Sequence, residues 1–96
     1  MPIDLFICPE EGAESITVEL IRERFVSAGL PCSIEMHDEP WIVFDGRESD
    51  LVFTVDAEGR ASSAVMQASM NDDPEFGERV FAVFETFGWS SGEDSF

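Results

Sequence analysis

The spacing of apolar residues predicts a first amphipathic helix in the early part of the chain. Its buried stripe recurs at helical intervals and comprises Val18, Ile21, Phe25 and Ala28, with Leu20 beside it. Ser15 is a suitable N-cap, because its side chain can accept a hydrogen bond from a free N–H of the first turn. Gly29 and Pro31 predict the end of the helix, since glycine adopts the left-handed conformation and proline cannot continue a helix.

A second helix is predicted near the end of the chain. Its apolar stripe comprises Phe76, Val80, Val83, Phe84 and Phe87. Asp73 is the expected N-cap, and Pro74 suits the first helical position because its missing N–H would be unpaired there anyway. Gly88 predicts the end of this helix, with Trp89 packing back onto it.

The remaining apolar segments predict strands. Residues 3–8 form an apolar run that ends at a proline, and residues 33–39 alternate between apolar and polar. Residues 41–44 are apolar at every position, so a strand formed by them would be apolar on both faces. Residues 51–55 alternate again and lead into a hairpin turn at 56–60 with Gly59 in the left-handed position. Residues 61–70 have helix-favouring residue types, but the hairpin needs a returning partner, which favours a strand.

This order predicts an α+β fold, βαβββ(β)α, in which the two helices cover one face of the sheet as a two-layer sandwich. The first helix would connect two parallel strands, 3–8 and 33–39, and the rest of this mixed sheet would be antiparallel. We expect one domain over residues 1–89 and a flexible acidic tail over 90–96.

Charge limits the partners of the chain. It contains 21 Asp and Glu residues against five Arg and no Lys, a formal net charge of −16. Direct binding to nucleic acid or to an anionic membrane is disfavoured, because affinity for phosphate comes from Lys and Arg. A basic protein surface is a more suitable partner. A saline environment would also select acidic residues, but would spread them evenly, whereas here they concentrate in residues 35–50 and 72–78.

The cysteines and the N-terminal residues predict a cytoplasmic protein. Cys8 and Cys32 are too few for a disulfide scaffold, and their apolar neighbours predict buried thiols, although one bridge between them remains an alternative. Residues 1–4 carry no basic segment that would begin a signal peptide, and no stretch has the length of a membrane span.

Catalytic and metal motifs are lacking in the sequence. His37 is the sole histidine and lies between Glu35 and Glu39, where a solvated side chain is expected. The acidic loop at Asp45, Glu48 and Asp50 offers oxygen ligands for a hard cation, but its spacing is not that of an EF-hand and a solvated turn is favoured. We therefore predict no enzyme activity, no metal and no cofactor.

The acidic segment around Trp41 is the candidate binding surface. It consists of Glu35, His37, Asp38, Glu39, Trp41, Asp45, Glu48 and Asp50. The run 41–44 is apolar on both faces, which predicts that one of these faces is left uncovered by the helices. An apolar patch surrounded by charge is typical of a protein interface.

Two functions follow from these features. The first is an inhibitor, comparable in physical type to immunity proteins, antitoxins and DNA mimics, that neutralises a basic target such as a nuclease, a toxin or a nucleic-acid-binding protein. The alternative is a structural or regulatory module that associates as a homodimer and whose acidity serves solubility.

Overall fold

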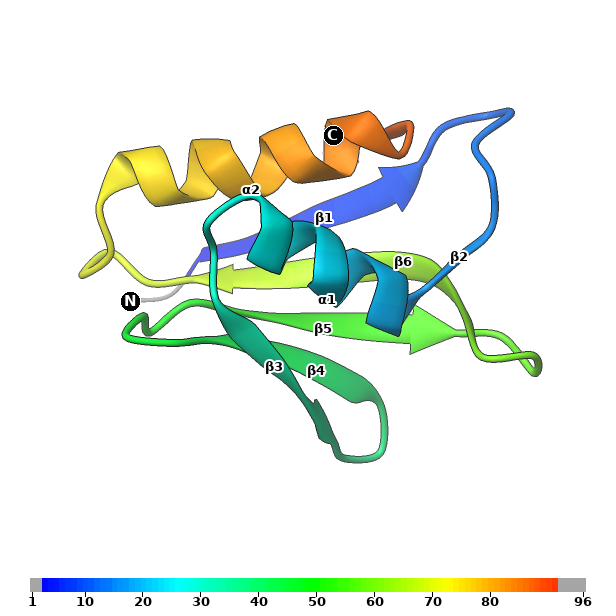
Figure 1. The fold of residues 1–96 in the computed structure, drawn as a ribbon, viewed down its shortest axis with the longest axis horizontal. Coiled ribbons are helices and arrows are strands. Elements are labelled where there is room, and N and C mark those ends of the chain that lie inside the picture. Colours follow the sequence, from blue (N-terminus) through cyan, green and yellow to red (C-terminus); the bar gives the residue numbers. More distant parts are fainter. Residues whose placement is uncertain (1–2, 92–96) are drawn as a thin grey trace.

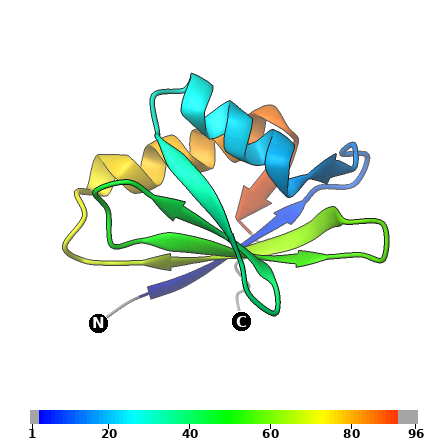
Figure 2. The ribbon, with the colours of Figure 1, turned by 60° about the horizontal axis from the view of Figure 1, so that its bottom comes forward.

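The computed structural model describes residues 3–91, which form two helices and a seven-stranded sheet (Figure 1). In chain order the elements are β1 (Ile3–Pro9), β2 (Ile16–Thr17), α1 (Val18–Ser27), β3 (Cys32–Met36), β4 (Pro40–Phe44), β5 (Asp50–Val55), β6 (Arg60–Ala68), α2 (Pro74–Thr86) and β7 (Trp89–Ser91). The α+β class and the placement of both helices on one face of the sheet are confirmed (Figure 2).

The sheet has the strand order β3-β4-β5-β6-β1-β7, with the short β2 pairing to β6, and every strand pair in it is antiparallel. The predicted parallel pair is therefore wrong. The chain leaves α1 at the far edge of the sheet, and β4, β5 and β6 then return it by hairpins to β1. Strands β1 and β3 run in the same direction, but three strands separate them.

Helix α1 begins two residues later than the sequence predicted. Its N-cap is Thr17, not Ser15, and the Thr17 hydroxyl accepts a hydrogen bond of 3.2 Å from the N–H of Leu20. Pairing of β2 with β6 holds the preceding residues extended, which delays the helix start. The helix ends as predicted: Gly29 has φ +87°, and the N–H of Leu30 donates to the Phe25 carbonyl.

Helix α2 is capped as predicted, because the Asp73 side chain accepts a hydrogen bond of 3.0 Å from the N–H of Phe76. Trp89 packs back onto the helix and stacks on Phe84 at 5.4 Å between ring centroids. The predicted start of the tail at residue 90 is too early, however, because residues 89–91 pair with β1 as strand β7. Residues 92–96, the rest of the predicted tail, lie outside the described part of the chain.

The strand predictions hold with shifted limits. Strand β6 confirms the choice of strand over helix for the segment after residue 60, and Gly59 has the expected positive φ of +83° in the preceding turn. Strand β3 ends at Met36, so residues 37–39 form the tip of a β3–β4 hairpin instead of continuing the strand. Pro40 begins the next strand rather than interrupting one.

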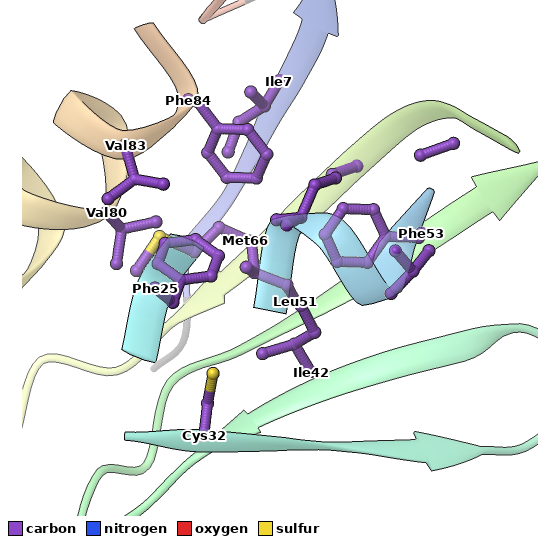
Figure 3. Close-up of a cluster of buried hydrophobic side chains, with 14 of the residues drawn as sticks. Ile7, Phe25, Cys32, Ile42, Leu51, Phe53, Met66, Val80, Val83 and Phe84 are labelled. Carbon is purple, nitrogen blue, oxygen red and sulfur yellow. The ribbon is translucent and has the colours of Figure 1, made fainter. Parts of the chain in front are cut away.

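The core lies between the helices and the sheet (Figure 3). Its centre is a chain of edge-to-face aromatic contacts in which Phe25 lies 5.1 Å from Phe44 and 5.7 Å from Phe84. Inward-facing side chains of four strands complete it, namely Ile7, Ile42, Leu51, Phe53 and Met66. The alternate residues of the same strands face away from the helices, and they form the candidate site.

Candidate protein-binding site

The face of the sheet opposite the helices carries a row of apolar side chains. By strand register, Phe6 lies beside Val65, Val65 beside Val52, and Val52 beside Trp41. We name these four residues the apolar row and the surface that holds them the open face. Phe6 is 56% exposed and the other three are half-buried, because both helices lie on the other side (Figure 2).

Carboxylates border the apolar row. Asp4 of β1 and Asp50 of β5 lie in the row of residues next to the apolar row, because they pair from opposite sides with the same residue of β6. Glu35 pairs with Trp41 and so ends the row at the β3 edge. Glu39 lies on the other flank, where it accepts a hydrogen bond of 3.5 Å from the Thr54 hydroxyl. The open face therefore presents an apolar centre with a negative margin.

Arginines leave this negative margin uncompensated in the described part of the chain. Over residues 3–91, the arginine ion pairs join Arg47 to Asp73 at 3.5 Å and Arg60 to Glu58 at 3.8 Å. Neither pair includes a carboxylate of the margin. Over residues 3–91, the carboxylates of the margin are therefore not paired with an arginine.

The β3–β4 hairpin brings His37 between Glu35 and Trp41. The His37 Nε2 atom lies 3.2 Å from Glu35 Oε1, and the imidazole ring meets the Trp41 ring edge-on at 5.2 Å. All three side chains extend the open face toward the tip of the hairpin, where Asp38 is also exposed. Cys32 lies on the opposite, buried face of β3, so the histidine has no neighbouring thiol in that strand.

Asp50 is the carboxylate of the margin with the least favourable surroundings. Its Oδ1 atom is buried and has no hydrogen-bond partner in the described part of the chain. Desolvation by this burial, and next the negative charge of Glu35, raise the pKa of Asp50 above its ordinary value of 3.8. A cation placed over these two carboxylates would offset their mutual repulsion, whereas desolvation of Asp50 would persist.

Glu48 lies outside this group, because it takes part in a set of hydrogen bonds between two loops. Its carboxylate accepts hydrogen bonds from the Ser69 hydroxyl at 3.0 Å and from the Asn71 amide at 2.9 Å. The Asp72 carboxylate accepts hydrogen bonds from the Ser49 hydroxyl at 2.6 Å and the Ser49 N–H at 2.8 Å. We name these five residues the loop clamp.

The structure thus divides the surface predicted from the sequence. It gathers Glu35, His37, Glu39, Trp41 and Asp50 on the open face, with Asp38 at the adjoining tip. It does not bring in Asp45, which lies in the exposed turn after β4, or Glu48 of the loop clamp. The three carboxylates of the acidic loop therefore lie in three different places. Over residues 3–91, no group of three or more metal-ligating side chains occurs.

Sequence reasoning missed half of the open face. Phe6, Val52, Val65 and Asp4 all belong to it. The signal was present as alternation, since Leu5 and Ile7 point toward the helices and Phe6 points away. The strand order was needed to place β1 and β6 beside the strands that carry Trp41 and Asp50.

The two cysteines are free and lie on different faces of the sheet. Cys32 is buried as predicted, and desolvation raises the pKa of its thiol to about 11. The burial expected for Cys8 is wrong, because its side chain alternates onto the exposed side of β1. No bridge joins the two residues.

Two cavities formed by the described residues lie away from the open face. One of about 550 Å³ is lined by the loop after β1 and the adjoining parts of α1 and α2, and one of about 530 Å³ lies between the two helices. Arg24 contributes to both, and its guanidinium lies 4.9 Å from the centre of the Phe87 ring. Neither cavity includes a residue of the predicted binding surface.

No family model, curated protein or solved structure matches this chain. Across residues 3–91, neither helix has the length and apolar character needed to cross a membrane.

Proposed function

We propose that this protein is a binding domain, not an enzyme, and that its open face neutralises a basic target protein. One observation carries the proposal. The apolar row is uncovered and is bordered by Asp4, Glu35, Glu39 and Asp50, none of which pairs with an arginine in the described part of the chain.

The two components of the open face would contribute differently to a complex. Aromatic side chains such as Trp41 and Phe6 bury large areas and are typical of the residues that dominate binding free energy. Uncompensated carboxylates attract a basic surface over distance and accelerate encounter, an effect that salt screens. A partner with an apolar patch surrounded by Lys and Arg would satisfy both.

The target class follows from charge. Nucleases, toxins that act on nucleic acid and other nucleic-acid-binding proteins carry basic surfaces because they neutralise phosphates. An acidic face that occupies such a surface would block it, in the manner of an immunity protein or a DNA mimic. The two free thiols are compatible with the reducing cytoplasm, where we place this activity.

The exposed apolar row also favours a second candidate, a self-associating module. Two copies could cover their rows against each other, as homodimers commonly do. Face-to-face association would, however, bring together margins of like charge on chains of net charge −16. The basic target is therefore the primary proposal.

The test is capture of partners from a lysate of the source organism by three forms of the immobilised protein. These forms are the wild type, Glu35→Gln/Glu39→Gln on the open face, and Glu23→Gln/Glu85→Gln on the exposed surface of the helices. The two variants change the net charge equally, so they differ only in where the charge is lost.

We expect a basic protein that binds the wild type and the helix variant, binds the open-face variant weakly, and is released by high salt. Trp41→Ala should weaken the isolated complex by about 30-fold if Trp41 is a binding hot spot. Equal capture by both charge variants would contradict the proposal. A chain that captures no basic protein and sediments as a dimer would favour the self-associating module.

A further inference from the structure

One edge of the sheet has a free row of backbone hydrogen-bonding groups. Strand β3 is the first strand in the strand order, and among residues 3–91 it pairs only with β4. At the two ends of this ladder, the N–H of Asp45 donates to the Pro31 carbonyl and the N–H of His37 donates to the Glu39 carbonyl. These bonds fix which residues of β3 face β4.

Bonded and non-bonded pairs alternate along an antiparallel ladder. Ser33 and Glu35 therefore exchange hydrogen bonds with β4, whereas the N–H and C=O groups of Cys32, Ile34 and Met36 point away from it. No backbone hydrogen bond to these outward groups occurs within residues 3–91. Because Cys32 is buried, the accessible part of the free edge consists of Ile34 and Met36, which offer two donors and two acceptors in a regular row.

This edge lacks most of the features that prevent strands from pairing with other chains. Edge strands are commonly shortened, bulged or supplied with lysine. Strand β3 has five residues in unbroken register with β4, and the chain contains no lysine. Within the described residues, strand β7 at the opposite edge has three residues.

The side chains along β3 define what an added strand would carry. Ile34 and Met36 lie on the helix side of the sheet, and Met36 is 73% exposed. Ser33 and Glu35 lie on the open-face side, with His37 beside Glu35. Because side chains alternate along a strand, an added strand would need apolar residues on one side and cations on the other.

A second copy of the chain is a poor occupant of the edge. Pairing of β3 with its own copy across a two-fold axis would be antiparallel, and when centred on Ile34 it would place the two negatively charged Glu35 side chains at neighbouring diagonal positions on one face. Both chains would also carry a net charge of −16. Charge complementarity selects a basic segment instead.

We propose that the β3 edge accepts an extended segment of the basic target, with alternating apolar residues and Arg or Lys, as an additional strand of the sheet. This inference rests on the proposed function and adds to it a mode of recognition, in which backbone hydrogen bonds give affinity and alternate side chains give specificity. The apolar row would then contact the body of the target next to that segment.

The test uses a peptide of alternating Arg and Val as the probe, blocked at both ends, at low salt. We expect it to slow hydrogen exchange at the amides of Ile34 and Met36 by about tenfold or more, since these amides would become hydrogen-bonded. The matched control peptide is N-methylated at alternate residues, which removes the N–H groups that would face β3. It should give no such protection.

A pair of protein variants supplies an independent check. Met36→Pro removes one outward N–H without breaking a bond to β4, and Met36→Ala keeps that N–H while removing the same side chain. We expect Met36→Pro to bind the peptide at least about fivefold more weakly than Met36→Ala. Circular dichroism establishes that both variants fold; if the proline variant does not, the N-methylated peptide alone decides.

Three results would overturn the inference. Equal binding of both peptides to the open face, without protection of Ile34 and Met36, would leave the proposed function intact and remove the edge as its site. Protection of these amides without peptide, rising with protein concentration, would assign the edge to a second copy. Absence of peptide binding would also contradict the inference, whereas capture of a basic protein tests the proposed function separately.

Discussion

Asp72 and Asp50 both lie next to Ser49, but one belongs to the loop clamp and the other to the open face, and their carboxylates have different surroundings. The Asp72 carboxylate belongs to the loop clamp, where the N–H and hydroxyl groups of Ser49 donate to it. Asp50, the next residue after Ser49, lies on the open face. One of its carboxylate oxygens is buried and has no hydrogen-bond partner in the described part of the chain. One carboxylate is held by hydrogen bonds within the fold, and the other has a buried oxygen atom without such a bond among residues 3–91.

Their pKa values shift in opposite directions from the same ordinary value of 3.8. For Asp72, desolvation raises the pKa, but hydrogen bonds from Ser49 and Glu48 and the charge of Arg47 together outweigh it, so the pKa is lowered. For Asp50, desolvation and the nearby Glu35 both raise the pKa. Acidic residues that look alike in the sequence can therefore have pKa values shifted in opposite directions, and hydrogen-bond partners distinguish them.

The largest expected effect contrasts the two faces of the sheet. Phe84→Ala should lower the free energy of unfolding by about 3–5 kcal/mol, because it opens a cavity among Phe25, Phe53 and Trp89. Phe6→Ala on the open face should cost less than about 1 kcal/mol, since that side chain is largely solvated. Urea unfolding of both variants provides the measurement, and similar losses would contradict the assignment of the open face.

The loop clamp should give the next largest effect. Asp72→Asn should lower the free energy of unfolding at neutral pH by about 2 kcal/mol, because it weakens charge-assisted hydrogen bonds from Ser49 and Glu48. The lowered pKa means that this stabilisation is present above pH 3.8 and is lost as the pH falls through the folded-state value. The difference between wild type and variant should accordingly shrink in acid, and a constant difference would refute the role of the charge.

The helix cap beside the clamp should have a smaller effect. Asp73→Ala should cost about 1 kcal/mol, since it removes the acceptor for the N–H of Phe76 and the partner of Arg47. Asp73→Asn is the matched control, because asparagine also caps helices and should retain most of the stability. Thermal unfolding of both variants separates loss of the cap from loss of the charge.

Asp50→Asn should give the smallest effect, with the opposite sign. Neutralising Asp50 should raise the free energy of unfolding at neutral pH by up to about 0.5 kcal/mol, a small value because solvent screens a partly exposed group. The raised pKa means that the protonated form favours the fold, an advantage present below pH 3.8 and lost as the pH rises through the folded-state value. Destabilisation by Asp50→Asn at neutral pH would show that this carboxylate has a structural partner.

Local signals predicted both helices, because caps and apolar spacing act within a few residues. Asp73, Pro74 and the stripe from Phe76 to Phe84 suffice to position α2. The misplaced start of α1 has a tertiary cause, since β6 holds Ile16 and Thr17 extended as β2. Strand β7 is of the same kind, because Ser90 and Ser91 carry no strand signal and become extended by pairing with β1.

These local signals could not predict the strand order. A helix between two strands suggested a parallel neighbour pair, whereas the three successive hairpins from β3 to β6 determine that β1 pairs with β6. The same limit applies to the candidate site. Trp41 and Glu35 were predicted from one segment, but Phe6 and Val65 join them only through long-range register.

The rate of association with the captured basic partner tests the central claim most directly. It should be measured at low and high salt for the wild type, Glu35→Gln/Glu39→Gln and Glu23→Gln/Glu85→Gln. The account predicts that the open-face variant associates about 3- to 10-fold more slowly at low salt, that the helix variant differs little from wild type, and that high salt removes the difference. Equal rates for the two variants at low salt would contradict the assignment of the open face as the binding surface.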